Sequence, residues 1–545
     1  MKTKTNLLFL LFFPFLLNAQ DCYLAPQFED IIIEKDIVYG QNATALFINS
    51  LGEAVSEDLL VDIYRPSIAN APRPLVIVLY DGNFLPPIIN GKIIGTKQDS
   101  SVVELCTRLA QYGYTAAAIS YRAGWNPLAA MQAERAATLI QAIYRGIQDG
   151  RTAVRFFRKT VAEDNNPYHI NPEQTAVIGI GSSGYIALGM ATLDEYTDII
   201  ETTHPAGKFL LDLDGDGTVE TPMVVEAYHG DIEGKMLSIA PDDTFGFPAG
   251  DTLNIPNHVE YESNIQLSMH IGGAIPDIGW LDATDPPIIS IQSAFDMLHP
   301  YREYPFIAPM FPEPIFPVQG GLFIAEKQEE FGNNQLFYDA EISDVYTDEA
   351  IANSALATTE GHPYYEGLYP FVNPPNSFGY DEGVAIDWWD STTIITPEGL
   401  AWNEYPHPSG GTYHSNGLLT NEGMSAEKAR MNIEKVIGYF APRAFVALGL
   451  DASDCMPVNV STLESKEIHL SIFPNPANEE IILTTDRKMR MESVQILDLN
   501  GQLIRNYPNV NNHLLFIKRN KLSSGMYVLK IQLEGVMLSK KLLFK

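Results

Sequence analysis

Residues 171–187 constrain the fold of this chain most, because they combine a strand, a sharp turn and a helix. Thr175 to Gly179 form a short apolar run, which is typical of a central parallel strand. Residues 185–193 are rich in Ala, Leu and Met and predict a helix. The glycines and serines between them predict an elbow so tight that the residues two before and two after its apex must be small.

This steric rule selects the residue at the apex of the elbow. If Ser182 or Ser183 stood there, a bulky residue, Ile180 or Tyr185, would occupy one of the small positions. Only Gly181 leaves small residues on both sides. We therefore expect Gly181 at the apex, where glycine tolerates unusual backbone angles.

The segments around the elbow alternate between buried strands and amphipathic helices. Such alternation predicts an α/β fold with a doubly wound parallel sheet. Residues 302–425, which are irregular and rich in proline and aromatic residues, are expected to form a long cap insertion. The predicted elements are strands 74–80, 114–122, 265–269, 287–292 and 444–450 and helices 101–112, 128–157 and 425–439.

The order of these elements and the elbow resemble the α/β-hydrolase esterases over residues 55–450. In that family the elbow apex is the catalytic serine of a Gly-x-Ser-x-Gly motif. The resemblance implies that Gly181 stands at the nucleophile position and that the serine is missing. The alternative is that Ser182 or Ser183 acts from a shifted elbow.

The segment after strand 74–80 resembles the oxyanion loop of the same esterases. From the last residue of that strand it reads Tyr80-Asp81-Gly82-Asn83-Phe84 where the family carries His-Gly-Gly-Gly-Phe. The resemblance implies that the backbone amides of Gly82, Asn83 and Ser182 form the oxyanion hole. The Asp81 carboxylate would be unfavourable beside a developing oxyanion. An ordinary strand-end turn is the alternative, and the order of the surrounding elements favours the oxyanion loop.

The acid and the histidine of a catalytic triad follow the nucleophile along the chain in this family. Residues 287–301 resemble the esterase segment whose aspartate orients the histidine, and Asp296 falls on that aspartate. His414, shortly before helix 425–439, is the best-placed histidine, and His407 and His362 are weaker candidates.

Residues 209–220 contain oxygen-bearing side chains at the spacing of a calcium loop. Met223 replaces the bidentate glutamate of an EF-hand, so we expect either a structural Ca²⁺ site or a plain turn. The fold requires no cofactor. The candidate ligands are Asp212, Asp214, Asp216, Thr218 and Glu220.

Both ends of the chain indicate export. Residues 1–20 have the basic start, apolar core and small-residue end of a signal peptide. Residues 451–470 read as a linker, and residues 471–545 predict a small β-sandwich. That sandwich resembles the type A C-terminal sorting domain of Bacteroidota type IX secretion, which implies the type IX machinery as partner and a secreted or outer-surface location.

Charge and cysteine content narrow the function further. The net charge of −33 argues against nucleic acid and anionic membranes as partners. The three cysteines of an exported chain favour one disulfide, with Cys22–Cys106 preferred to the pairings that include Cys455. We expect an esterase-like protein of the secreted class that is weakly active or inactive. The alternatives are an active serine hydrolase using Ser182 or Ser183 with Asp296 and His414, and a non-catalytic binding protein.

Overall fold

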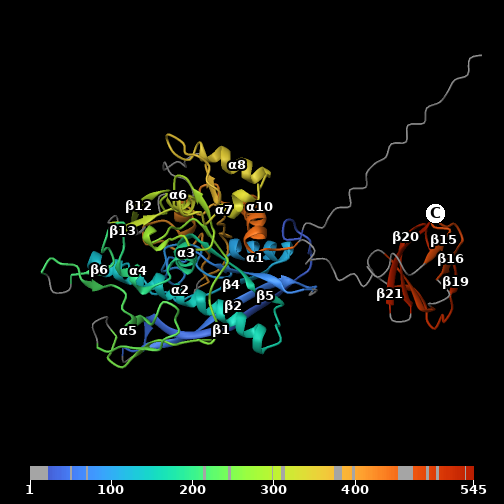
Figure 1. Ribbon diagram of the computed structural model, residues 1–545, viewed down its shortest axis with the longest axis horizontal. Coiled ribbons are helices and arrows are strands. Elements are labelled where there is room, and N and C mark those ends of the chain that lie inside the picture. The colour runs from blue at the N-terminus through green and yellow to red at the C-terminus, as the bar shows by residue number, and fades with distance from the viewer. Residues whose placement is uncertain are drawn as a thin grey trace, which may run out of the picture. The chain divides into compact units, whose positions relative to one another are not determined.

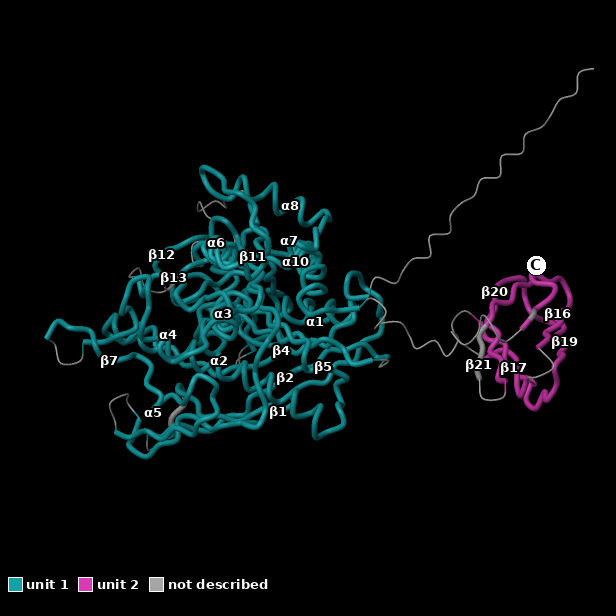
Figure 2. The backbone as a smooth tube through the Cα atoms, viewed as in Figure 1, with its two compact units in different colours: residues 1–455 teal, residues 456–545 magenta. Residues whose placement is uncertain are grey.

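The computed structural model describes residues 22–49, 52–68, 71–212, 216–242, 247–296, 299–307, 314–373, 383–395, 399–451, 470–485, 490–498, 503–533 and 536–545. The chain divides into two compact units, residues 1–455 and 456–545 (Figure 2). The predicted signal peptide, residues 1–20, and residues 452–469 of the predicted linker lie outside the described residues.

The larger unit is built on an eight-stranded mixed sheet (Figure 1). Its strand order is β1-β2-β4-β3-β5-β10-β11-β14. The pairings β1–β2 and β2–β4 are antiparallel, and all the others are parallel. The strands are β1 (Ile31–Ile48), β2 (Ala54–Pro66), β3 (Arg73–Leu79), β4 (Thr115–Ile119), β5 (Ile170–Ile180), β10 (Leu267–Ile271), β11 (Ile288–Ser293) and β14 (Leu368–Phe371).

Helices cover both faces of this sheet, as its central strands require. Every residue of β3 and of β4 is buried, so neither strand has a solvent face. One face packs against α2 (Gln132–Glu163) and α3 (Gly184–Thr192), and the other packs against α1 (Ser100–Tyr112) and α10 (Ala426–Ala447). The predicted doubly wound α/β fold is confirmed.

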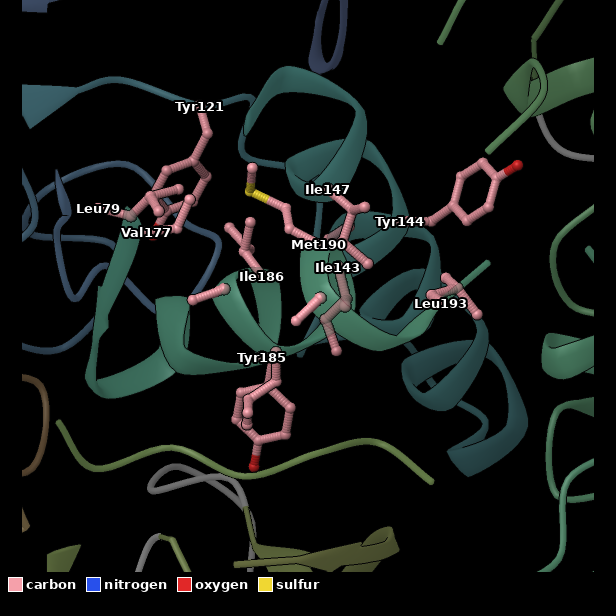
Figure 3. Close-up of a cluster of buried hydrophobic side chains, with 14 of the residues drawn as sticks. Leu79, Tyr121, Ile143, Tyr144, Ile147, Val177, Tyr185, Ile186, Met190 and Leu193 are labelled. Atoms are coloured by element: carbon pink, nitrogen blue, oxygen red, sulfur yellow. The ribbon is translucent and has the colours of Figure 1, made fainter. Parts of the chain in front are cut away.

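Glycines let α3, the helix after the elbow, approach α2 closely (Figure 3). A Cβ on Gly146 would lie 2.5 Å from the Cδ1 of Ile186, and one on Gly150 would lie 2.3 Å from the Sδ of Met190. Larger residues at these two positions of α2 would push α3 away. Because α3 begins directly after the elbow, this packing also fixes the elbow against the sheet.

The remaining elements of this unit are short, and along the sequence most of them occur in the connections between strands of the main sheet. They are the 3-10 turns Gly181–Ser183 and Ile278–Trp280, the strands β6 (Leu210–Leu211), β7 (Thr221–Pro222), β8 (Ser238–Ile239), β9 (Thr252–Asn254), β12 (Glu303–Ile307) and β13 (Pro314–Gln319), and the helices α4 (Tyr196–Ile200), α5 (Glu226–His229), α6 (Gly321–Phe331), α7 (Gln335–Asp339), α8 (Val345–Ser354) and α9 (Tyr413–Thr420).

Two sequence predictions differ from this architecture. The predicted strand 444–450 is wrong, because α10 continues through Pro442 to Ala447. Its apolar residues Ala441, Ala444 and Leu448 are buried at helical spacing. Residues 302–425 also contain β14, which pairs with β11 as the edge strand of the main sheet.

The preferred Cys22–Cys106 disulfide is also contradicted. Cys22 is disulfide-bonded, whereas Cys106 is a free and fully buried cysteine on α1. Cys106 packs in the apolar core on that face of the sheet, and burial raises the pKa of its thiol. Cys455, the third cysteine, lies outside the described residues.

The smaller unit is all-β, as the sequence predicted. It contains one sheet of β15-β16-β19 and another of β18-β17-β20-β21, which share an apolar core. The strands are β15 (Ser471–Phe473), β16 (Glu480–Thr484), β17 (Met491–Leu497), β18 (Leu503–Tyr507), β19 (Leu514–Lys518), β20 (Gly525–Leu533) and β21 (Val536–Phe544). In the described part of the chain, no helix has the length and apolar character that crossing a bilayer requires.

Candidate active site of the α/β unit

The turn between β5 and α3 has the geometry of a nucleophile elbow. Gly181 has a φ of +55°, which side-chain-bearing residues rarely adopt. A Cβ on Gly179 would lie 2.3 Å from the carbonyl oxygen of Ser183, so only glycine fits there. The close contact at Gly179 is an example of the rule that residues near the apex must be small. The sequence analysis used that rule to place Gly181 at the apex.

A carboxylate from the neighbouring strand occupies the space beside the apex. β3 and β5 are adjacent parallel strands, so the residues that follow them meet at one edge of the sheet. A Cβ on Gly181 would lie 2.3 Å from the Cγ of Asp81 and 2.4 and 2.7 Å from its two carboxylate oxygens. The Asp81 carboxyl group therefore fills the place where an apex side chain would begin.

The three amides predicted for the oxyanion hole converge at this point. The amide of Ser182 donates to Oδ1 of Asp81 at 3.0 Å. The amides of Gly82 and Asn83 donate to Oγ of Ser182 at 3.2 and 2.8 Å, and that hydroxyl donates to Oδ1 of Asp81 at 2.8 Å. Each amide thus has an acceptor within the protein.

Ser183, the other candidate nucleophile, is engaged in holding the elbow to β3. Its hydroxyl lies 2.8 Å from the carbonyl oxygen of Leu79 and accepts the amide of Ile180 at 2.8 Å. The residue is completely buried. This hydroxyl therefore connects the ends of β3 and β5 by hydrogen bonds.

Lys92 forms an ion pair with Asp81, and the pair affects the pKa of both groups. Burial alone would raise the pKa of Asp81, but the charges of Lys92 and His299 outweigh it and the pKa is lowered. Burial alone would likewise lower the pKa of Lys92, yet the Asp81 charge raises it overall. Both groups are therefore charged at neutral pH.

Asp296 lies beside a histidine that the sequence analysis did not select. Nδ1 of His299 is 3.0 Å from Oδ2 of Asp296, and both side chains are almost fully buried. His414 lies elsewhere, on α9, and accepts a hydrogen bond at its Nδ1 from the Trp389 indole at 3.0 Å. The structure therefore brings together Asp296 and His299, and it does not bring Asp296 to His414.

The position of His299 explains why it was missed. The expected triad order places the histidine late in the chain, shortly before helix 425–439, whereas His299 follows the same strand as Asp296. The segment after β14 contains no histidine before His407. Within that segment, a Cβ on Gly383 would lie 2.9 and 3.1 Å from the two carboxylate oxygens of Asp296. Glycine thus stands where a side chain of the segment after β14 could have contacted the acid.

Lys92, His299 and Gly383 border a cavity of about 160 Å³. Burial raises the pKa of Asp387 well above its ordinary value, and the nearby charge of Asp81 raises it further. Asp387 also lines the cavity, and its burial disfavours the charged form of its carboxyl. The other polar lining residues include Lys92, His299, Trp389, Asn416, Thr420 and Asn421.

The candidate calcium loop lies at the tip of the β6–β7 hairpin. Oδ2 of Asp212 accepts the amide of Gly217 at 3.0 Å, and Oδ1 of Asp216 accepts the amide of Thr218 at 2.7 Å. Asp214 lies outside the described residues. Across the described ranges, no three His, Cys, Asp or Glu side chains gather as a metal ion would need.

The strand order and the sharp turn between β5 and α3 define the larger unit as an α/β-hydrolase fold. Residues 471–545 match the family model described as the secretion system C-terminal sorting domain. The predicted type IX sorting domain is thereby confirmed, and with it a destination at the cell surface or outside the cell. No curated protein sequence matches the chain.

Several solved esterase structures resemble parts of the chain. Esterase 2 of Thermogutta terrifontis phosphorylated by paraoxon is 17% identical over 30% of this chain and 48% of its own, with a TM-score of 0.20. Its propionate-bound form is 13% identical over 63% and 85%, with a TM-score of 0.29. A bacterial heroin esterase is 18% identical over 30% and 39%, with a TM-score of 0.19. These TM-scores are low, so the fold assignment rests on strand order and elbow geometry.

Proposed function

We propose that this chain is a secreted protein of the α/β-hydrolase fold that does not hydrolyse esters through a serine. It instead binds a small ligand in the cavity lined by Lys92, His299 and Asp387. One observation carries the proposal. The Asp81 carboxylate fills the space that a side chain on Gly181 would take and accepts the Ser182 amide. Gly181 would then stand at the nucleophile position, as expected from the sequence.

Neither neighbouring serine is suited to replace the missing nucleophile. The Ser182 hydroxyl accepts two backbone amides and donates to Asp81, and the residue is 2% exposed. The Ser183 hydroxyl is tied to the end of β3. An attacking oxygen needs a free lone pair directed at the substrate and a base within hydrogen-bond reach. Both hydroxyls are committed to internal bonds.

The same carboxylate also opposes the second requirement for ester hydrolysis. An oxyanion hole accelerates acyl transfer because its donors point at the position where negative charge develops. Here those donors bind a carboxylate and a hydroxyl of the protein, and the pKa of Asp81 is lowered, so the carboxylate is charged. Loss of one such donor costs about 10²–10³-fold in kcat, and a fixed negative charge adds repulsion.

The cavity favours a small and uncharged polar ligand. Its volume of about 160 Å³ is below the roughly 300–1,000 Å³ that holds drug-sized ligands. The charge of Lys92 is balanced by Asp81, and burial raises the pKa of Asp387 and so disfavours its charged form. An uncharged ligand therefore suits this lining best. Trp389, Asn416 and Asn421 offer an aromatic surface and amides for hydrogen bonding.

An active esterase is the second candidate, and one observation favours it. The His299–Asp296 hydrogen bond is the pairing that orients a catalytic base in serine hydrolases. In this alternative Ser182 or Ser183 would be the nucleophile, with Asp296 and either His299 or the sequence-predicted His414. The serine would have to leave its present hydrogen bonds before reacting.

Hydrolysis of p-nitrophenyl acetate distinguishes the two candidates. We expect the purified chain to hydrolyse it no faster than the Ser182→Ala and Ser183→Ala variants do. Saturable hydrolysis that either substitution abolishes, while circular dichroism stays unchanged, would support the esterase and exclude the binding protein.

The sorting domain implies the type IX machinery as a partner during export. We propose that residues 471–545 are removed after passage and that the α/β unit is released or attached at the surface. Mass spectrometry of the extracellular protein from a type IX-competent host tests this. A chain that still ends at Lys545 would contradict removal of the domain.

Calcium is proposed as a structural ion of the loop 212–220. Two observations support this proposal. The acidic residues have the spacing of a calcium loop, and the carboxylates of Asp212 and Asp216 accept backbone amides of the same loop. The expected result is a melting temperature that is higher in calcium than in EGTA and loses that difference in Asp216→Asn. Equal melting temperatures would exclude a structural role for the ion.

A further inference from the structure

A second cavity, away from the elbow, contains a buried arginine. Arg145 lies in the middle of α2 and is only 7% exposed. Its Nε has no hydrogen-bond partner, and no described residue forms a hydrogen bond or ion pair with its guanidinium. Burying a cation is costly unless another group compensates its charge.

The surroundings do not supply that compensation. The carboxylate whose charge acts on Arg145 is Asp149, one turn along α2. Asp149 is already paired with Arg122 at 2.9 Å, and both of these side chains are completely buried. Burial, together with the charge of Arg122 and against the opposing effect of Asp149, lowers the pKa of Arg145 to about 9. Asp149 is thus shared with Arg122, and Arg145 has no ion-pair partner of its own among the described residues.

The positive charge of Arg145 also acts on the neighbouring residue His229. Burial and the charge of Arg145 lower the pKa of His229 to about 3, so the imidazole is neutral at neutral pH. The chain also keeps space for the guanidinium, because a Cβ on Gly124 would lie 2.8 Å from its Nη2. The fold therefore leaves room for the Arg145 guanidinium. This positive charge is buried although the chain as a whole has a net charge of −33.

Arg145 and His229 line a cavity of about 30 Å³. A cavity needs about 10–15 Å³ by this measure to hold one water molecule, so this one accepts a single small ion but no phosphate ester or nucleotide. Thr44, Gln141 and Tyr228 add polar groups to its walls. The hydroxyl of Tyr228 is bonded to Asp242, which keeps this carboxylate engaged.

We propose that this cavity is a binding site for a small monovalent anion, of which chloride is the probe of matching size, held by the guanidinium of Arg145. The anion supplies the negative charge that Arg145 lacks as a partner. It would contact α2 and the segments around residues 43–45 and 228–229. The site is independent of the elbow and of the function proposed for it.

The first test measures the melting temperature of the full chain in sodium chloride, sodium bromide and sodium gluconate at equal ionic strength. Gluconate is too large for the cavity. An anion well above its Kd should raise the melting temperature by about 2–3 °C in the two halides. In Arg145→Met the difference between halide and gluconate should vanish. Because that change removes an unpaired buried charge, it should not lower the stability in gluconate.

Arg151→Met is the matched control, since Arg151 lies on the same helix but donates to the carbonyls of Ile232 and Leu193 and pairs with Glu233. This variant should be less stable in every salt and should keep the halide difference. A halide difference that survives Arg145→Met, or wild-type melting temperatures that are equal in all three salts, would overturn the proposal.

Anomalous diffraction from wild-type crystals in bromide decides the matter even if a variant does not fold. The expected result is a bromide peak within hydrogen-bond distance of the Arg145 guanidinium. Water density at that place, with bromide only on the surface, would show that solvent compensates the charge and would refute the site.

Discussion

Substitutions at Asp81 and Gly181 should be strongly coupled, because the carboxyl of one residue occupies the side-chain space of the other. Gly181→Ser introduces a Cβ 2.3 Å from the Cγ of Asp81 at a φ of +55°. The left-handed backbone costs about 1–2 kcal/mol for a residue with a side chain. Crowding in a packed interior adds about 1–3 kcal/mol. The expected loss of unfolding free energy is therefore about 2–5 kcal/mol.

The double variant should recover the steric part of this loss. In Asp81→Ala the carboxyl is gone, so Gly181→Ser should then cost only the ~1–2 kcal/mol of the backbone. The coupling energy between the two positions should be about 1–3 kcal/mol in the stabilising direction. Asp81→Ala by itself should destabilise by roughly 1–3 kcal/mol, since it leaves the Ser182 amide and Lys92 without an acceptor.

Denaturant unfolding followed by tryptophan fluorescence measures this cycle in the larger unit alone, because all five tryptophans lie within residues 1–455. Gly332→Ser is the matched control. Gly332 has a φ of +79° with no atom within 4 Å of a Cβ, so its substitution should cost only the backbone term and should add to Asp81→Ala without coupling. Additive effects at Asp81 and Gly181 would refute the assignment of the carboxyl to the apex space.

Two further predictions concern buried charges away from the cavity. Burial raises the pKa of Asp285 to about 8 from an ordinary value of 3.8, so the folded protein keeps a proton that the unfolded chain releases near pH 4. The stabilising effect of this proton is complete below about pH 4 and is lost as the pH rises to about 8. Asp285→Asn should therefore raise the unfolding free energy at pH 8, by up to about 5 kcal/mol, and much less at pH 4. An equal effect at both pH values in denaturant titrations would contradict this. Lys97→Met should destabilise the protein by about 3–5 kcal/mol, because it leaves the fully buried Asp62 without its cation; the paired variant Lys97→Met/Asp62→Leu should recover most of the loss, and no recovery would show that the ion pair is not the cause.

The sequence predicted the elements that are governed by local rules. The restriction on small residues around Gly181 follows from backbone sterics, and alternating strands and helices lead directly to a doubly wound sheet. The strand predicted over 444–450 is wrong because a short apolar segment is compatible with a strand or a helix, and α10 continues through Pro442. The four residues of β14 are too few to stand out within an irregular segment.

The arrangement of the site depends on contacts that sequence order does not reveal. The sequence showed that Asp81 would be unfavourable near an oxyanion, but its place beside Gly181 requires the adjacency of β3 and β5. His299 was missed because the expected order of triad residues pointed to a later histidine. Its position three residues after Asp296, in one post-strand segment, was the available signal.

Reaction with a fluorophosphonate, followed by intact-mass measurement and peptide mapping, tests the central claim most directly. With a carboxylate in the apex space and both neighbouring serines engaged, the wild-type chain should show no mass increase under conditions that label an active serine hydrolase completely. A stoichiometric adduct on Ser182 or Ser183 would contradict this account and identify the protein as a serine esterase.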